Sequence, residues 1–302
     1  MQTALITHPD CLLHDMGQDQ PEVSARITVI DDALNALNLK KYSAPLANPV
    51  ELYRAHEKEY VDHIFKIAPK DDLICLDPDT WMNPYSLNAA LRAAGAVILA
   101  VDLIMKGEVQ KVFCNVRPPG HHAEKNVAMG FCIFNNVAVG VLHALIHHHL
   151  KRIAIVDFDA HHGNGTENIF SEDPRVLYCS SFEHPFYPFS GADTKSSHII
   201  NIPLNAGTTG EIFREKARKQ WLSEITNFKP DMIFFSAGFD AYYKDPLADL
   251  SFHEEDYAWI TQEVVKIANE ICEGRIVSVL EGGYALETLG GCALAHVRAF
   301  DV

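Results

Sequence analysis

The chain of 302 residues lacks the features that mark several large classes of protein. It has no C-x-x-C pair, and its seven cysteines are scattered at positions 11, 75, 114, 132, 179, 272 and 292. This pattern argues against a disulfide framework or a zinc ribbon and fits a reducing compartment. The N-terminal segment shows no basic stretch followed by a long apolar one, and no uninterrupted apolar run approaches the length of a membrane span. We therefore expect a cytoplasmic protein that does not enter a membrane.

Positive charge is also scarce. Lys and Arg number 25 against 40 Asp and Glu, which gives a formal net charge of −15 with His neutral. Such a surface repels phosphate backbones, so we expect no direct binding to nucleic acid. Long-range attraction would favour cationic partners such as basic peptides or polyamines, although acidity can also serve solubility alone. No feature of the sequence indicates an oligomeric state.

Apolar runs alternate with amphipathic stretches along the chain, and no Gly/Ser-rich or Pro-rich linker divides it. Short runs rich in Val, Ile and Phe predict strands at 111–116, 152–158, 176–179, 232–236 and 275–280. Longer stretches predict helices at 86–105, 135–149, 209–228 and 254–273. Continuous apolar strands that alternate with helices are typical of a parallel sheet covered on both faces. We predict a single α/β domain over residues 1–302.

Four of the apolar runs pass directly into polar segments that contain glycine. These segments are RPPGHHAE, DFDAHHGNGT, SAGFDA and EGGY. In open parallel sheets, ligands bind at the carboxyl ends of the strands, where such loops gather. We therefore expect the four segments to converge on one pocket.

The segment DFDAHH places two carboxylates and a histidine at alternate positions, Asp157, Asp159 and His161. On an extended strand these side chains share a face, and two carboxylates on one face repel unless a cation lies between them. Carboxylate with imidazole suits zinc or manganese, and the absence of thiolate argues against a structural zinc site. The alternative is a strand end whose acidic residues cap the next helix.

Asp240 follows another predicted strand after the turn Ala-Gly-Phe. Alone, an Asp after a glycine turn is more often a turn or cap residue. Beside Asp159 and His161 it would complete a three-ligand set with one open position, as in catalytic zinc sites.

Three further groups are candidates for chemistry or for structure. Adjacent His121 and His122 cannot easily bind one metal together, but they can transfer protons beside it. Tyr284 follows two glycines and could hydrogen-bond a developing oxyanion, although ordinary packing explains most such tyrosines. The histidines at 147–149 end an apolar helical stretch, and we interpret them as solvated residues near the negative end of the helix dipole.

In this order the motifs RPPGHHA, GFCIFNN, DFDAHHGNGT, SAGFDA and LEGGY resemble the histone deacetylase family, the zinc-dependent branch of the arginase-deacetylase superfamily. The resemblance extends over nearly the whole chain, from PEVSAR onward. The asparagine at position 164 resembles class II enzymes, acetylpolyamine amidohydrolases and bacterial homologues, whereas class I enzymes carry Asp there. The resemblance implies an α/β three-layer sandwich with a central, mainly parallel eight-stranded sheet and a narrow tunnel leading to zinc.

Position by position, the resemblance implies that Asp159, His161 and Asp240 bind the catalytic zinc ion. His122 matches the general base, which then acts as the acid, and Tyr284 matches the residue that polarises the acetyl carbonyl. The implied reaction is metal-assisted hydrolysis of an amide by activated water.

The same resemblance implies supporting roles for the neighbouring residues. His121 matches the electrostatic partner of the base, Asp157 supports the first histidine, and Asn164 supports the second. Phe131 matches one wall of the aliphatic slot. Gly130 lies where a backbone carbonyl receives the substrate amide, although its sequence context alone fits core and tunnel wall equally.

Structural potassium is implied as well. The ligands of one potassium site, some of which bind through backbone carbonyls, match Asp157, Asp159, His161, Ser180 and Ser181. The spacing of Phe170, Asp173 and Val176 fits a second monovalent site.

The chain departs from many relatives in the loop that walls the tunnel. Phe182 stands where they have His, and Phe189 stands where they commonly have Gly. We place Phe189 in the substrate-binding set. In LDPDT, one of Asp77 and Asp79 is expected to supply the rim carboxylate that holds the substrate backbone.

From the resemblance we expect the substrate to be an acetylated lysine side chain of a protein or peptide. The alternative within the family is acetylpolyamine, which the acidic composition also allows. A manganese ureohydrolase would require further carboxylate ligands for its metal. A non-catalytic binding module would have lost a metal ligand, the second histidine or Tyr284, but this chain has the three ligands, His122 and Tyr284.

Overall fold

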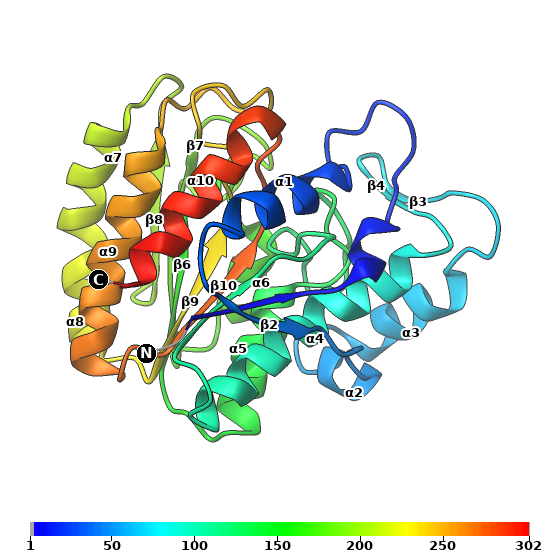
Figure 1. Cartoon of the computed structure of the whole chain (residues 1–302), viewed down its shortest axis with the longest axis horizontal. Coiled ribbons are helices and arrows are strands. Elements are labelled where there is room, and N and C mark those ends of the chain that lie inside the picture. The colour runs from blue at the N-terminus through cyan, green and yellow to red at the C-terminus, as the bar shows by residue number, and fades with distance from the viewer. Residues whose placement is uncertain (1–2, 302) are drawn as a thin grey trace.

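The computed structural model describes residues 3–301, which form a three-layer α/β sandwich around one eight-stranded sheet (Figure 1). The strand order is β2-β1-β5-β10-β9-β6-β7-β8, and every neighbouring pair is parallel. The strands are β1 (Thr3–Thr7), β2 (Lys40–Ser43), β5 (Lys111–Cys114), β6 (Ile153–Asp157), β7 (Val176–Glu183), β8 (Ile199–Leu204), β9 (Met232–Ala237) and β10 (Ile276–Leu280). The predicted fold class is confirmed.

Helices cover both faces of the sheet (Figure 1). On one side are α2 (Pro49–Leu52), α3 (Lys58–Ile67), α4 (Ser86–Met105), α5 (Asn136–Ile146) and α6 (Asn164–Phe170). On the other are α1 (Ala25–Leu34), α7 (Gly210–Ala217), α8 (Ser223–Phe228), α9 (Glu254–Ile271) and α10 (Leu286–Arg298). Short 3₁₀ turns occupy Pro9–Leu12 and Ala299–Asp301, and a π-helical turn, Arg218–Leu222, joins α7 to α8.

Alternating strand residues build the two cores. Ala4 and Ile6 of β1 pack into the core beneath α4 and α5, whereas Leu5 packs into the opposite core. The same alternation separates Ile155 from Val156 in β6. Because both faces of each central strand are buried, these strands are apolar without interruption, which is why their sequences identify them.

The sequence did not reveal β1, β2 and β8, and it gave no sign of an interruption within one predicted helix. β2 has the sequence KKYS and is mostly exposed at the sheet edge, so it carries no apolar run. The stretch 209–228 is not one α-helix, because the π-helical turn interrupts it. Two antiparallel strands, β3 (Ile74–Asp77) and β4 (Thr80–Met82), form a small hairpin away from the main sheet (Figure 1).

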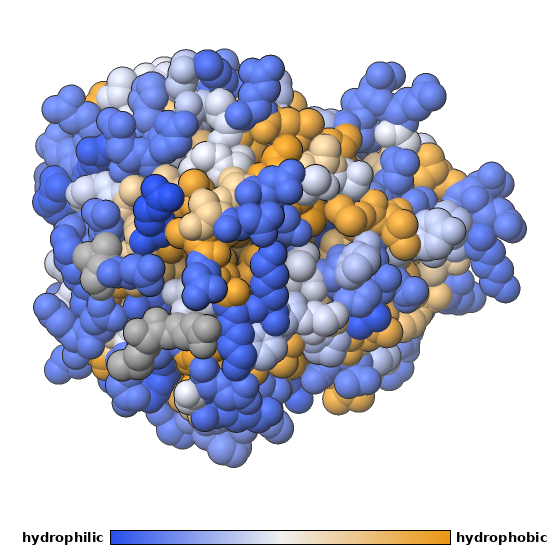
Figure 2. Space-filling model, in the orientation of Figure 1, coloured by the Kyte–Doolittle hydropathy of each residue, from blue (hydrophilic) through white to orange (hydrophobic). Residues whose placement is uncertain are grey.

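By length and composition, α4 could cross a membrane, which the sequence reading did not anticipate. Alanines and aliphatic residues raise its mean hydropathy despite the charged Arg92 and Asp102. Within the fold, 72% of that apolar window is buried against the rest of the protein, as in the core helix of a globular domain. The face seen in Figure 2 is largely hydrophilic, with hydrophobic residues showing around α1. All seven cysteines are free.

Candidate active site

The four glycine-containing segments follow β5, β10, β9 and β6, which are consecutive neighbours in the middle of the sheet. Their strands are parallel, so all four segments leave the sheet at the same edge. The predicted convergence of these loops is therefore confirmed.

Three of the predicted site residues, Asp159, His161 and Asp240, form a buried cluster. His161 Nδ1 lies 3.2 Å from Asp159 Oδ1 and 3.1 Å from Asp240 Oδ2. The opposite ring nitrogen, Nε2, lies 3.1 Å from the carbonyl oxygen of Leu247. Since that carbonyl can only accept, Nε2 of His161 carries a proton, and a metal ion that displaces the proton from Nδ1 would be bound by the lone pair of that nitrogen. Three ligand atoms thus face one point.

Backbone donors orient the two carboxylates of this cluster. β6 ends at Asp157, so Asp159 and His161 lie beyond the strand and do not share a strand face with Asp157 as predicted. Instead, the chain turns, and the amide of His161 donates to Asp159 Oδ1 at 2.9 Å. The amide of Gly282 donates to Asp159 Oδ2 at 2.8 Å, and the amide of Ala160 donates to Asp240 Oδ1 at 2.7 Å.

The electrostatics of the cluster favour a cation. Burial and the charge of Asp159 raise the pKa of Asp240 to about 7. Burial opposes protonation of His161, but the two carboxylates raise its pKa well above the ordinary value. Tetrahedral zinc, with bonds of about 2.0–2.1 Å, places neighbouring ligand atoms about 3.3 Å apart, close to the spacing seen here. The donor set therefore fits zinc with one position left open.

Hydrogen bonds fix the ring of His122. Asn164 donates its amide to Glu124 Oε1 at 2.8 Å, which turns Asn164 Oδ1 toward His122 Nδ1, also at 2.8 Å. Because that oxygen only accepts, Nδ1 carries the proton and Nε2 of His122 is free to accept one. Burial, together with the neighbouring His121 and His161, lowers the pKa of His122 well below its ordinary value. His122 is therefore neutral and suited to act as a base.

His121 differs from its neighbour in charge. Its Nδ1 lies 3.1 Å from Asp157 Oδ2. Burial would lower the pKa of His121, but Asp159 and Asp157 raise it to about 10, so the ring carries a positive charge. Glu281 accepts from the amides of Gly120 at 2.7 Å and His121 at 3.1 Å. Glu281 is thus a further residue of the site, in the EGGY motif, for which the sequence alone predicted no role.

A cavity of about 220 Å³ opens beside the cluster. It is lined by Asp79, His122, Gly130, Phe131, His161, Phe186, Tyr187, Leu247 and Tyr284. Gly130 has a φ of 57°, and a Cβ on it would lie 2.3 Å from the His122 ring, so the close approach requires glycine. The lining combines apolar and aromatic residues with a few polar groups.

The structure revises the predicted cavity wall. Phe189 does not line the cavity; its side chain is 75% exposed and borders a separate surface hollow. Tyr187 and Phe186 line it instead, and the sequence reading missed both, although they stand only two and three residues before Phe189. Asp79 lines the cavity and accepts from the amide of Gly130 at 2.9 Å, whereas Asp77 is not part of the lining.

Tyr284 lies against Phe131, with ring centroids 5.9 Å apart. The guanidinium of Arg26 stands 4.9 Å from the Tyr284 ring centroid and donates to the carbonyl of Gly283 at 2.7 Å. Burial raises the pKa of Tyr284 well above its ordinary value, so the phenol keeps its proton and can donate it in a hydrogen bond.

Arg26 belongs to a fully buried charge network that the sequence reading did not identify. Glu22 pairs with Arg26 at 3.0 Å and also accepts two hydrogen bonds from Arg117. Burial would raise the pKa of Glu22, but Arg117 and its neighbours lower it to about 2. Through Arg26, this network holds the backbone that carries Tyr284.

We expect Glu22→Gln to lower the free energy of unfolding by about 3 kcal/mol at pH 7, because two buried guanidinium groups lose their carboxylate. The native pKa of Glu22 is depressed below the ordinary 4.5, so the stabilisation is present above about pH 4.5 and is lost toward pH 2. The difference between wild type and variant should therefore shrink in acid. Urea unfolding at pH 7 and pH 3 measures it.

The matched control is Glu255→Gln, whose side chain is 76% exposed. We expect its free energy of unfolding to change by less than about 0.5 kcal/mol. Equal unfolding midpoints for the two variants would contradict the role given to Glu22.

The two predicted potassium sites differ in whether a polar atom is left without a hydrogen-bond partner. Ser180 Oγ is buried without a hydrogen-bond partner among residues 3–301, and Ser180 pairs in register with Asp157. At the second site the carbonyl of Phe170 already accepts from Asp173 N at 3.0 Å and from His198 Nε2 at 3.1 Å. An unpartnered atom thus supports only the first of the two.

Comparison with known proteins agrees with this geometry. Residues 20–300 match the family described as histone deacetylase domain. A probable deacetylase of Archaeoglobus fulgidus is 34% identical over 302 residues, covering 95% of this chain and 82% of that protein. Polyamine deacetylase HDAC10 of Mus musculus is 36% identical over 314 residues, covering 96% of this chain, which spans about half (46%) of that protein.

A solved structure, the crystal structure of the HDA15 HD domain, superposes with a TM-score of 0.92 at 32% identity. The match covers 98% of this chain and 90% of that one. Fold, motif order and sequence identity agree, and the chain belongs to the histone deacetylase family of hydrolases.

Proposed function

We propose that the chain is a zinc-dependent deacetylase that removes acetyl groups from lysine side chains of proteins or peptides. One arrangement carries this proposal. Asp159, Asp240 and Nδ1 of His161 face a single buried point, and His122 lines the same cavity with its Nε2 unprotonated. Such a set binds a catalytic metal and places a base beside it.

A zinc ion bound there supplies Lewis acidity, which polarises a carbonyl and makes water a stronger nucleophile near neutral pH. His122 Nε2 accepts the proton of the attacking water as the new C–O bond forms. The phenol of Tyr284 donates to the oxygen on which charge develops. As the C–N bond breaks, His122 returns the proton to the departing amine, and acetate is released.

The other residues hold these groups in place. Asn164 and Glu124 fix the tautomer of His122. His121, which is paired with Asp157, places a positive charge next to His122. Leu247 fixes the tautomer of His161. The hydrogen-bonding neighbours orient a metal ligand or a base and strengthen its basicity. The charge of His121 acts in the opposite direction and lowers the pKa of His122.

The apolar cavity supports lysine as the side chain that enters it. Phe131, Phe186, Tyr187 and Leu247 provide walls for a chain of methylene groups. A second candidate is acetylpolyamine, because the carboxylate of Asp79 lies in the lining and the net charge of −15 attracts polycations. One relative is named polyamine deacetylase.

We further propose a structural potassium ion at Ser180, Ser181 and the segment Asp157–His161, supported by the unpartnered Ser180 hydroxyl. The family match over residues 20–300 supports one catalytic domain across residues 1–302.

Release of acetate tests the proposal. We expect the purified chain to hydrolyse an acetyl-lysine peptide faster than N-acetylputrescine, to stop when a chelator is added, and to recover with zinc. Faster hydrolysis of acetylputrescine would favour the polyamine candidate. No turnover of either substrate by zinc-loaded protein would contradict deacetylation.

A further inference from the structure

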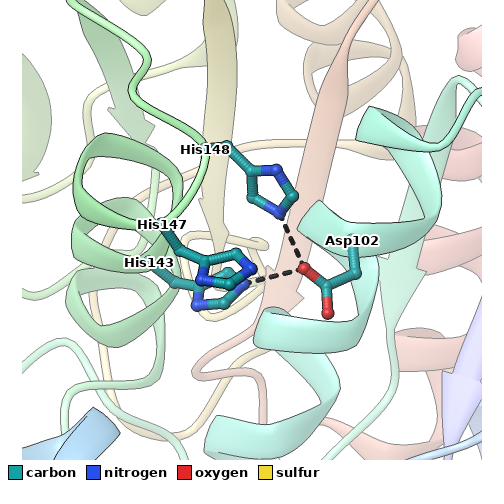
Figure 3. A group of neighbouring side chains, drawn as sticks. All are labelled: Asp102, His143, His147 and His148. Atoms are coloured by element: carbon teal, nitrogen blue, oxygen red, sulfur yellow. Dashed lines mark hydrogen bonds and ion pairs between the residues drawn. The ribbon is translucent and has the colours of Figure 1, made fainter.

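A second cluster of side chains of the types that bind metals lies outside the active site (Figure 3). Asp102 comes from the last turns of α4 and His143 from α5, and His147 and His148 directly follow the end of α5. β5 and β6 begin six and seven residues after these helices end. The cluster is therefore at the edge of the sheet where strands begin, opposite the catalytic loops.

The contacts in this cluster are close. His143 Nε2 lies 2.8 Å and His148 Nε2 lies 2.7 Å from the same oxygen, Asp102 Oδ1. The rings of His143 and His147 stack with centroids 4.7 Å apart. One ligand atom from each of the four residues lies within 4.8 Å of all the others. His148 was thus misread as solvated, because its side chain is only 19% exposed and is bonded to Asp102.

We propose that Asp102, His143, His147 and His148 form a second metal site, which binds a divalent transition-metal ion of the zinc type. Three imidazoles and one carboxylate make a complete four-ligand set, which is typical of a structural rather than a catalytic zinc site. Nitrogen-rich sets of this kind select zinc, nickel or copper over magnesium and calcium. The ion would join the ends of α4 and α5.

The spacing along the chain suits this geometry. His143 and His147 stand four residues apart, so their side chains project from the same face of α5. Tetrahedral zinc separates its ligand atoms by about 3.3 Å. The present hydrogen-bonded distances of 2.7 and 2.8 Å would therefore open by about half an ångström when the ion binds.

Arg54 opposes metal binding. Its guanidinium lies 3.1 Å from His143 Nδ1, and since it can only donate, Nδ1 accepts and Nε2 of His143 carries the proton. When an ion binds at Nε2, the ring proton moves to Nδ1 and Arg54 must withdraw. We therefore expect the four ligands to bind the ion, and we expect removal of the Arg54 guanidinium to tighten that binding.

The site is tested by the zinc stoichiometry of the untagged full chain, which is first stripped with a chelator, then reloaded with excess zinc and dialysed to remove unbound ion. We expect two equivalents of bound zinc in the wild type, and one in the double variant His147→Gln/His148→Gln. Magnesium should not occupy the second site. Arg54→Gln should bind the second equivalent about tenfold more tightly, because a charged hydrogen bond no longer competes.

The control variant is His149→Gln, an exposed neighbour outside the cluster, and it should keep both equivalents. Circular dichroism confirms that each variant is folded. One equivalent in the wild type, or two in the double variant, would overturn the proposal. Asp240→Ala distinguishes this site from the catalytic one, because it should lose the other equivalent and retain this one.

Discussion

Tyr284→Phe should reduce kcat on an acetyl-lysine peptide by roughly 100- to 1000-fold, the usual effect of removing one oxyanion donor. The substitution removes only the hydroxyl. The ring keeps its packing against Phe131 and its place beside Arg26. Metal content and melting temperature should therefore stay at wild-type values, and the loss should fall on kcat rather than on folding.

Tyr243→Phe is the matched control, because that side chain is 45% exposed and does not line the cavity. It should leave kcat unchanged. If Tyr284→Phe were fully active, the phenol would have no part in the reaction.

Asp240→Ala should remove the catalytic metal and reduce acetate release to background. Only Asp159 and His161 would remain of the three ligands, and two ligands rarely retain zinc in a site that water can enter. Zinc analysis by mass spectrometry should show one equivalent fewer than in wild type.

Asp240→Asn guards against a folding defect. Its amide oxygen can still accept from the backbone of Ala160, but its charge is gone. The control Asp32→Ala, at an exposed position of α1, should keep metal and activity. Unchanged zinc content in both Asp240 variants would contradict the ligand assignment.

The residues of the candidate metal site could be found in the sequence because they follow buried strands. Asp159 and His161 come after β6, and Asp240 comes after β9; the uninterrupted apolar runs of these strands are visible in the sequence. The order of the strands in the sheet could not be predicted from these apolar runs. Glu281 reaches the amides of Gly120 and His121 only because β10 lies next to β5.

Gly130, Phe131 and Asp79 were predicted near the substrate and line the cavity, but the wall formed by the loop 186–189 could not be predicted, for a different reason. Phe186, Tyr187 and Phe189 lie in a loop without periodicity, so their order in the sequence does not say which side chains point inward. Phe189 has a φ of 62° and turns its side chain to solvent, whereas its two neighbours face the cavity. His148 shows the same limit, since its partner Asp102 is 46 residues away in the chain.

The most direct measurement compares acetate release by metal-free protein with release after zinc is added back. The metal-free protein, checked by mass spectrometry, should be inactive on the acetyl-lysine peptide, and zinc should restore activity in wild type but not in Asp240→Ala. Hydrolysis by the metal-free protein at the untreated rate would contradict zinc-dependent deacetylation.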